Sequence, residues 1–126
     1  MRPTRPKILV VNQHQRNLQL LAEFLSTVGY DPLPVSSMEA LDQTLDGGSD
    51  IGATLVDISG FGQEIWARCE RLRHKSIPFV LIYPNQGPAA HHAWLQYRAD
   101  RVIAKPLVMQ ELMNLIQYVL KEKEEP

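Results

Sequence analysis

The sequence predicts an α/β protein in which five β-strands alternate with five helices, (βα)5. Two observations support this fold class. Short apolar runs recur along the chain, and the segments between them carry apolar residues at helical spacing. Strands that are apolar at every position, and not only at every second one, are typical of parallel sheets buried on both faces. The fold is therefore expected to be a three-layer sandwich, with helices on both faces of a parallel five-stranded sheet.

Four of the expected strands are continuous apolar runs. These are ILVV at 8–11, ATLV at 53–56, FVLI at 79–82 and VIA at 102–104. A fifth strand is weaker and lies within YDPLPVS at 30–36, where Pro32 and Pro34 cannot donate hydrogen bonds to a neighbouring strand. Because proline within sheets is largely confined to edge strands, this segment is expected at an edge.

The segments between the strands repeat apolar residues with a helical period, so each helix should present one apolar stripe to the sheet. The stripes are Leu18, Leu21, Leu25 and Val28; Met38, Leu41 and Leu45; Ile65, Cys69 and Leu72; and Val108, Leu112, Leu115 and Val119. A fourth helix is expected between the last two strands, and it contains Trp94 and Tyr97. Ser36 followed by Glu39 predicts a capping box at the start of the second helix.

Length and composition indicate one globular domain over residues 1–126, with a core of about 6–122 and a charged tail, KEKEEP. Thirteen basic and fourteen acidic residues give a formal net charge of -1, which argues against nucleic acid as a direct partner. The apolar runs are too short to cross a membrane, and no signal peptide is evident. We therefore expect a soluble, cytoplasmic protein without a membrane partner.

Polar side chains stand where the expected strands end. Asn12 and Gln13 follow the first strand, Asp57 follows the third, and Lys105 follows the fifth. In open α/β sheets, ligands bind in the crevice outside the carboxyl ends of the strands. Because the carboxyl ends of parallel strands meet at one edge of the sheet, these side chains are expected to converge on one crevice.

Four stretches together resemble the receiver domain of two-component response regulators. They are KILVVNQHQRNLQLLAEFL, ATLVDISGFGQEIWARCERLR, IPFVLIYP and ADRVIAKPL, which follow the family's order over essentially the whole chain. The resemblance implies a flavodoxin-like sandwich with strand order 2-1-3-4-5, in agreement with the alternation of strands and helices. It also implies that the chain is a signalling module in a phosphorelay and is not itself an enzyme. Its partners would be signalling proteins: a histidine kinase, an output domain or another regulator.

Two positions keep the residues that this family uses in phosphoryl transfer. Asp57 falls where the family places the aspartate that accepts a phosphoryl group from a histidine kinase. Lys105 falls where the family's lysine contacts that group, and the family often holds the following bond, here to Pro106, in the cis form. The resemblance thus implies that Asp57 is the phosphoacceptor position.

Other positions depart from the family pattern. Receivers normally carry two acidic residues after the first strand, which hold Mg²⁺, whereas this chain has Asn12 and Gln13. Since Mg²⁺ prefers carboxylate oxygens, no cofactor or metal is expected; only if the chain is a functional phosphoacceptor would Asp57 and Gln13 hold Mg²⁺, and then weakly. Tyr83 replaces the family's threonine or serine, and Val102 replaces the aromatic residue that moves with it. The phosphorylation switch is therefore expected to be degenerate at these positions.

These departures leave two main hypotheses. The first is an atypical, pseudo-receiver-like module that acts through protein interaction, with impaired Mg²⁺-dependent phosphorylation and an ion pair between Asp57 and Lys105. The second is a functional phosphoacceptor, phosphorylated on Asp57 by a histidine kinase with Mg²⁺ as cofactor. A third, distant hypothesis is a nucleotide- or flavin-binding domain, which the absence of a Gly-rich loop after the first strand disfavours. The expected partner face combines the fourth helix, with Trp94 and Tyr97, and the fifth strand and helix, and it could also support a homodimer.

Overall fold

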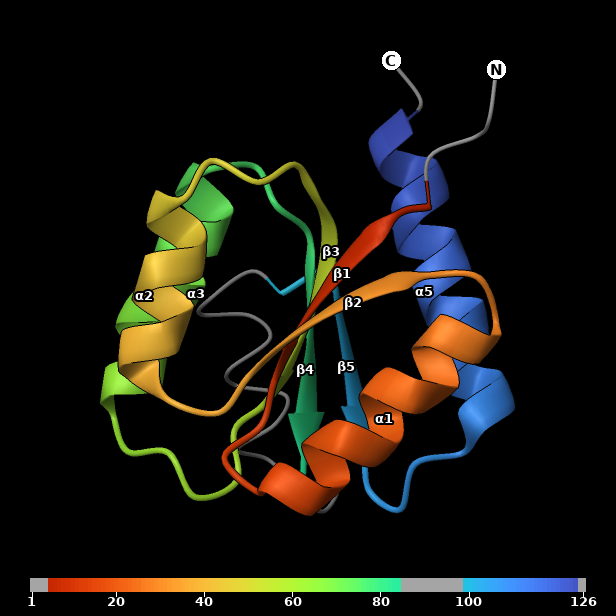
Figure 1. Cartoon of the computed structure of the whole chain (residues 1–126), viewed down its shortest axis with the longest axis horizontal. Helices are drawn as coiled ribbons and strands as arrows, with labels where there is room; N and C mark the ends of the chain where they lie inside the picture. The colour runs from red at the N-terminus through yellow and green to blue at the C-terminus, as the bar shows by residue number, and fades with distance from the viewer. Residues whose placement is uncertain (1–4, 85–98, 125–126) are drawn as a thin grey trace.

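A computed structural model of the chain has the expected three-layer α/β/α architecture (Figure 1). It describes residues 5–84 and 99–124. The strands are β1 (Lys7–Val11), β2 (Asp31–Val35), β3 (Ile51–Asp57), β4 (Phe79–Tyr83) and β5 (Arg101–Ala104). The helices are α1 (Gln15–Thr27), α2 (Met38–Asp46), α3 (Glu64–His74) and α5 (Met109–Glu124). The expected fourth helix lies outside the described residues.

The sheet is parallel, with the predicted strand order β2-β1-β3-β4-β5. The proline-containing strand β2 lies at one edge, as predicted, and Pro32 and Pro34 stand opposite Ile8 and Val10 of β1. The apolar runs of β1, β3 and β4 occupy the centre and are buried. The chain passes from β1 to β2 on one side and later to β3 on the other, so a topological switch point lies between β1 and β3.

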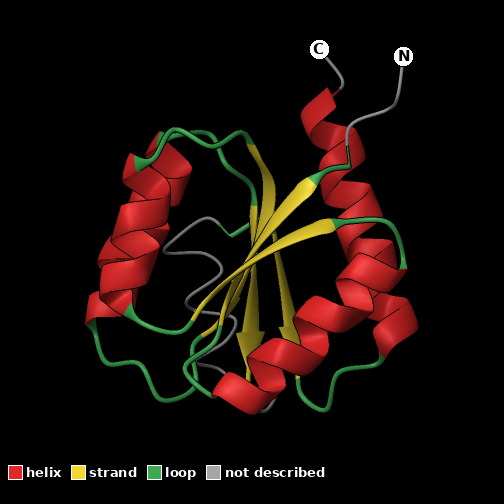
Figure 2. Cartoon of the chain, viewed as in Figure 1, coloured by secondary structure: helices red, strands yellow, loops and turns green. Residues whose placement is uncertain are grey.

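Helices cover both faces of the sheet: α1 and α5 lie on one face, and α2 and α3 lie on the other (Figure 2). Each pair of helices closes one hydrophobic core against the sheet, with Leu25 and Leu112 in the first core and Leu41 and Cys69 in the second. Burial raises the pKa of the Cys69 thiol to about 12, so this residue packs as a small apolar side chain. Within the described parts of the chain, no helix has both the length and the apolar character needed to cross a membrane.

Two local predictions were wrong. The N-cap of α2 is Ser37 and not Ser36: the Ser37 hydroxyl accepts a hydrogen bond from the Ala40 amide at 3.1 Å. The backbone remains extended through Ser37, so the helix begins one residue later than the capping-box pattern indicated. Val108 precedes α5 and is exposed. The buried stripe of α5 consists of Leu112, Ile116 and Val119.

Candidate functional site

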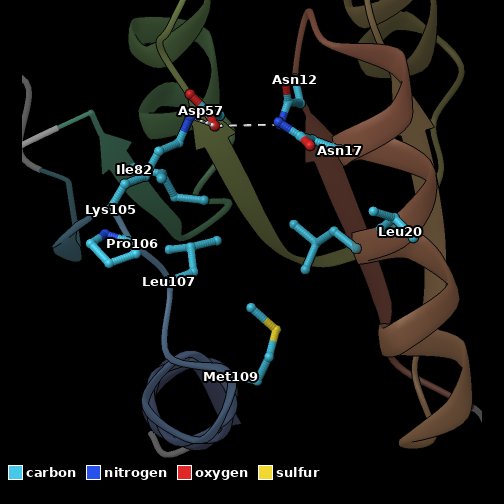
Figure 3. A pocket seen from close by; sticks show the side chains of 10 residues that line it. Asn12, Asn17, Leu20, Asp57, Ile82, Lys105, Pro106, Leu107 and Met109 are labelled. Atoms are coloured by element: carbon cyan, nitrogen blue, oxygen red, sulfur yellow. Dashed lines mark hydrogen bonds and ion pairs between the residues drawn. The ribbon is translucent and has the colours of Figure 1, made fainter.

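Three of the predicted site residues meet at the switch point. Asp57 is the last residue of β3, Asn12 directly follows β1, and Lys105 directly follows β5. Figure 3 shows their side chains pointing toward one another across the carboxyl ends of the strands. Asp57 and Asn12 are both buried. The convergence that the strand ends predicted is therefore observed for the carboxylate, the ammonium and one of the two amides.

Both carboxylate oxygens of Asp57 accept hydrogen bonds. Oδ2 lies 2.7 Å from Lys105 Nζ and 3.3 Å from Asn12 Nδ2. Oδ1 accepts from the backbone amide of Ser59 at 2.9 Å, which forms a turn of the kind that aspartate commonly makes with the residue two positions later. The predicted ion pair between Asp57 and Lys105 is thus confirmed. The Ser59 amide was not predicted, although the aspartate that ends a strand and begins DISG at 57–60 was a usable signal for this turn.

Lys105 is fixed from its backbone and from its ammonium group. Its amide donates to the carbonyl oxygen of Tyr83 at 2.8 Å, and its peptide bond to Pro106 is cis. In addition to Asp57, Nζ donates to the Ser59 hydroxyl at 3.3 Å. The side chain remains 31% exposed, so the ion pair is buried on the aspartate side and open to solvent on the lysine side.

Asn12 uses both ends of its side-chain amide. Nδ2 donates to Asp57, and Oδ1 accepts from the backbone amide of His14 at 2.8 Å. The Asn12 backbone amide also donates to the carbonyl oxygen of Val35 at 3.1 Å, which ties the end of β1 to β2. An aspartate at position 12 could still accept from His14 but could not donate to Asp57. The amide therefore provides a hydrogen bond that the usual acidic residue cannot make.

The Gln13 side chain reaches the loop that follows β3. Its side-chain amide oxygen occupies the space that a Cβ atom on Gly60 would need. Gly60 has φ +85, a conformation that other residues rarely adopt, so the backbone favours glycine there, whereas the end of the flexible Gln13 side chain could move aside for a Cβ atom. This contact was not predicted, because the sequence gives no indication of which loop the long Gln13 side chain will meet.

Among the described residues, those around Asp57 offer a resident Mg²⁺ ion a single carboxylate, which is already paired with Lys105. Mg²⁺ requires an octahedral set of oxygen ligands and is usually held by one or two carboxylates with free lone pairs. Among residues 5–84 and 99–124, no cluster of three or more His, Cys, Asp or Glu side chains is placed to hold a metal. The oxygens of Asp57 are engaged by N–H donors, and the Lys105 ammonium already supplies a positive charge at 2.7 Å.

The two predicted switch positions lie in the core. Tyr83 is buried in the cluster on the α2 and α3 face, and Val102 packs against the same cluster from β5. Val102 stands opposite Leu81, two residues before Tyr83 on the neighbouring strand. A phenol ring packed in this way is much larger than a threonine or serine hydroxyl, so the loss of the family's switch stays a prediction with a steric basis. The predicted partner residues Trp94 and Tyr97 lie outside the described residues.

A cavity of about 290 Å³ adjoins the ion pair, between α1 and the loop from β5 to α5. Asp57 and Lys105 line one part of it, and Leu20 of α1 and Met109 of α5 line another. The sequence did not predict this cavity, because Leu20 and Met109 fall outside the apolar stripes that place the helices on the sheet. The available signal was that these two apolar residues stand outside the stripes.

No family model matches the sequence. Among solved structures, the chain is similar to a CheY-like response regulator receiver domain protein from Methanospirillum hungatei, with 20% identity, a TM-score of 0.83, and 96% of this chain and 98% of that chain covered. A two-component response regulator from Clostridium difficile gives 20% identity and a TM-score of 0.84, with 96% and 100% covered. The N-terminal domain of a response regulator/sensory box/GGDEF 3-domain protein from Carboxydothermus hydrogenoformans is 22% identical, with a TM-score of 0.81. The match covers 94% of this chain and 96% of that chain. The chain therefore has the flavodoxin-like fold of response regulator receiver domains.

Proposed function

We propose that this chain is a receiver-like module of two-component signal transduction that acts through protein interaction, without relying on Mg²⁺-dependent phosphorylation of Asp57. The shared fold supports the signalling role. The observation that carries the second part is the Asp57 carboxylate, which accepts hydrogen bonds from Lys105 at 2.7 Å, from Asn12 at 3.3 Å and from the Ser59 amide at 2.9 Å. Its charge is balanced within the protein.

The charge balance of the crevice gives this proposal its physical basis. Carboxylates that share a site repel one another unless a cation lies between them. Here Asp57 is the only acidic side chain among the described residues that line the cavities beside it, and Lys105 offsets its charge. A bound Mg²⁺ is therefore not needed to relieve repulsion. An incoming phosphoryl group would also have to displace Lys105 or share it with Asp57.

Phosphoryl transfer to Asp57 should be slow for the same reason. Catalysis of this reaction depends on positioning and on cations that stabilise the charge of the transferring group. With Lys105 as the main source of positive charge, a deficit of about 3–4 kcal/mol in transition-state stabilisation would slow transfer by roughly two to three orders of magnitude. We therefore favour an interaction module over a phosphoacceptor.

We propose another signalling protein as the partner: a histidine kinase, an output domain or a further regulator, met in the cytoplasm. In the Carboxydothermus hydrogenoformans protein, the similar domain is the N-terminal part of a response regulator/sensory box/GGDEF 3-domain protein. The expected partner face includes β5 and α5, where the Arg101 guanidinium lies 4.4 Å from the centre of the Tyr118 ring. Tyr118 is exposed, and tyrosine and arginine are both enriched at protein interfaces. Nucleic acid is not proposed as a direct partner.

Mass spectrometry after incubation with a small phosphodonor tests the proposal. The wild-type chain, with Mg²⁺ and acetyl phosphate, should give no stoichiometric phosphoryl adduct, and beryllofluoride should leave its amide spectrum unchanged. A receiver that keeps both acidic residues, treated in parallel, shows that the reagents are active. An adduct confined to Asp57 that forms at the rate of that control would overturn the proposal and establish the phosphoacceptor hypothesis.

A further inference from the structure

We propose that the cavity between α1 and the β5–α5 loop binds a small amphipathic carboxylate, of the chemical class of a medium-chain fatty acid. The cavity measures about 290 Å³. This volume is near the lower end of the roughly 300–1,000 Å³ that is usual for ligand sites, so it suits a small molecule and not a drug-sized one. The carboxylate of the ligand would pair with Lys105, and its hydrocarbon chain would lie along α1 and the start of α5.

The lining of the cavity is divided into a polar end and an apolar end (Figure 3). The polar lining side chains are Asn12, Asn17, Asp57 and Lys105. The apolar ones are Leu20, Leu21, Ile82, Pro106, Leu107 and Met109. A ligand that is apolar throughout would leave the polar end without partners, and a fully polar one would gain nothing from the apolar end. The lining therefore matches a molecule with one polar head and one apolar body.

The apolar end has surface that a hydrocarbon chain could cover. Leu20 is 52% exposed and Met109 is 36% exposed, although they come from helices far apart in the sequence. Figure 3 shows Leu20 on the α1 side of the cavity, Leu107 on the opposite side, and Met109 beside α5. Covering such side chains removes apolar surface from water, which is the main favourable term in the binding of small apolar groups.

The polar end favours an anionic head over a cationic one. The Lys105 ammonium has three N–H donors; among the described residues, two are directed at Asp57 and the Ser59 hydroxyl, and the group is partly exposed. The Asn17 side chain lies at the same end and can donate a further N–H. Asp57, in contrast, already accepts three hydrogen bonds and is buried, so it offers little to an incoming ammonium group.

This inference deepens the proposed function and rests on it in one respect, namely that Lys105 and not Mg²⁺ balances the charge of Asp57. A ligand carboxylate that takes a share of the Lys105 ammonium would act on the loop that leads into α5. The position of this loop would then respond to a small molecule without any phosphoryl group. The ligand would thereby act on the same charge pair that phosphorylation acts on in the family this chain resembles.

Titration with three probes of equal chain length tests the nature of the head group. Octanoate, octylammonium and octanol are each added to the labelled wild-type chain in the presence of EDTA, and amide shifts are followed by NMR. Octanoate should shift Asn17, Leu20, Lys105 and Leu107 and bind at least about tenfold more tightly than octylammonium, which corresponds to about 1.4 kcal/mol. Hexanoate, with two methylenes fewer, should bind about an order of magnitude more weakly than octanoate.

Variants separate the contributions of the two ends. Asp57→Asn combined with Lys105→Met removes both charges together, so no buried charge is left unpaired; it should abolish the preference for octanoate over octanol. Leu20→Gln should weaken all three probes. Val108→Thr is the matched control, because Val108 is equally exposed, at 50%, but does not line the cavity. It should leave the binding of octanoate unchanged.

Several outcomes would overturn the inference: no response to octanoate, shifts away from the cavity, equal affinity for octylammonium, or a loss of binding in the Val108→Thr control as large as in Leu20→Gln. A separate Mg²⁺ titration in the absence of EDTA distinguishes this failure from that of the proposed function. Tight Mg²⁺ binding at Asp57 would contradict the proposed function. If neither Mg²⁺ nor octanoate changes the amide shifts, only the proposed ligand site is overturned.

Discussion

Two groups of charged side chains in this protein have similar distances between their charged atoms but very different exposure to solvent. In the crevice, Asp57 lies 2.7 Å from Lys105, and its side chain is 4% exposed. Between α2 and α3, Asp42 lies 2.8 Å from Arg68 and 3.2 Å from Arg71, and its side chain is 34% exposed. Distance alone therefore does not rank these ion pairs. Because exposed ion pairs contribute little and breaking a buried one is costly, the Asp57–Lys105 pair should matter more for stability than the Asp42 cluster between α2 and α3.

The surface pair has the better hydrogen-bond geometry of the two. Arg68 donates from both Nε and Nη2 to the two oxygens of Asp42, at 3.1 and 2.8 Å, and Arg71 extends the cluster to Asp46 at 2.7 Å. This arrangement holds α2 against α3. Because water competes for every group in it, its contribution to stability should be small and dependent on salt.

The largest expected effect comes from breaking the buried pair on one side. Lys105→Met leaves the buried Asp57 carboxylate with its two N–H donors but without a counter-charge. The free energy of unfolding should fall by about 3 kcal/mol, at the lower end of the usual range because solvent reaches the lysine side. Urea denaturation measures this change. The double variant Asp57→Asn with Lys105→Met should recover most of the loss. If Lys105→Met alone costs no more than the removal of a surface ion pair, the buried pair is not the more important of the two.

A smaller effect of opposite sign is expected at Thr54, a second buried polar residue. Among the described residues, its hydroxyl is the one buried side-chain polar atom without a hydrogen-bond partner. Asp57, in contrast, has partners for both oxygens. Thr54→Val removes the unsatisfied hydroxyl at nearly constant shape, so it should stabilise the fold by about 1 kcal/mol. Thermal and urea unfolding test this, with Thr54→Ser, which keeps the hydroxyl, as the control that should destabilise.

The smallest effect is expected at the surface cluster. Arg68→Ala should lower the free energy of unfolding by about 0.2–1 kcal/mol, and the difference should shrink at high salt. Hydrogen bonds from Arg68 lower the pKa of Asp42, so the contribution of this carboxylate is present above its unfolded pKa and is lost as the pH falls through its lower folded pKa. Acid titration of stability in wild type and Asp42→Asn checks the sign. A loss that appears only on raising the pH would contradict it.

The fold and the centre of the site could be predicted because both follow from where apolar runs begin and end. Asp57, Asn12 and Lys105 each stand at the end of an apolar run, and parallel strands bring such ends together. Pro32 and Pro34 placed their strand at the edge for an equally local reason, the missing amide donors.

Features that depend on packing between distant segments could not be predicted in the same way. The contact between Gln13 and Gly60 depends on the path of a loop, which the sequence does not indicate. The N-cap of α2 was misplaced by one position because two serines are adjacent and either can cap. The partner role of Trp94 and Tyr97 stays a prediction.

Magnesium binding separates the two hypotheses, because in an interaction module Asn12 and Gln13 remove the need for the ion. Mg²⁺ is titrated into the wild-type chain and into Asn12→Asp with Gln13→Asp, and amide shifts and the urea midpoint are recorded for each. The double variant should be less stable than wild type without metal, by about 1–2 kcal/mol, which corresponds to roughly one pKa unit of added repulsion. It should recover stability as Mg²⁺ binds in the millimolar range, while wild type responds in neither measurement. Saturable Mg²⁺ binding at Asp57 in wild type, with affinity equal to that of the double variant, would contradict the account.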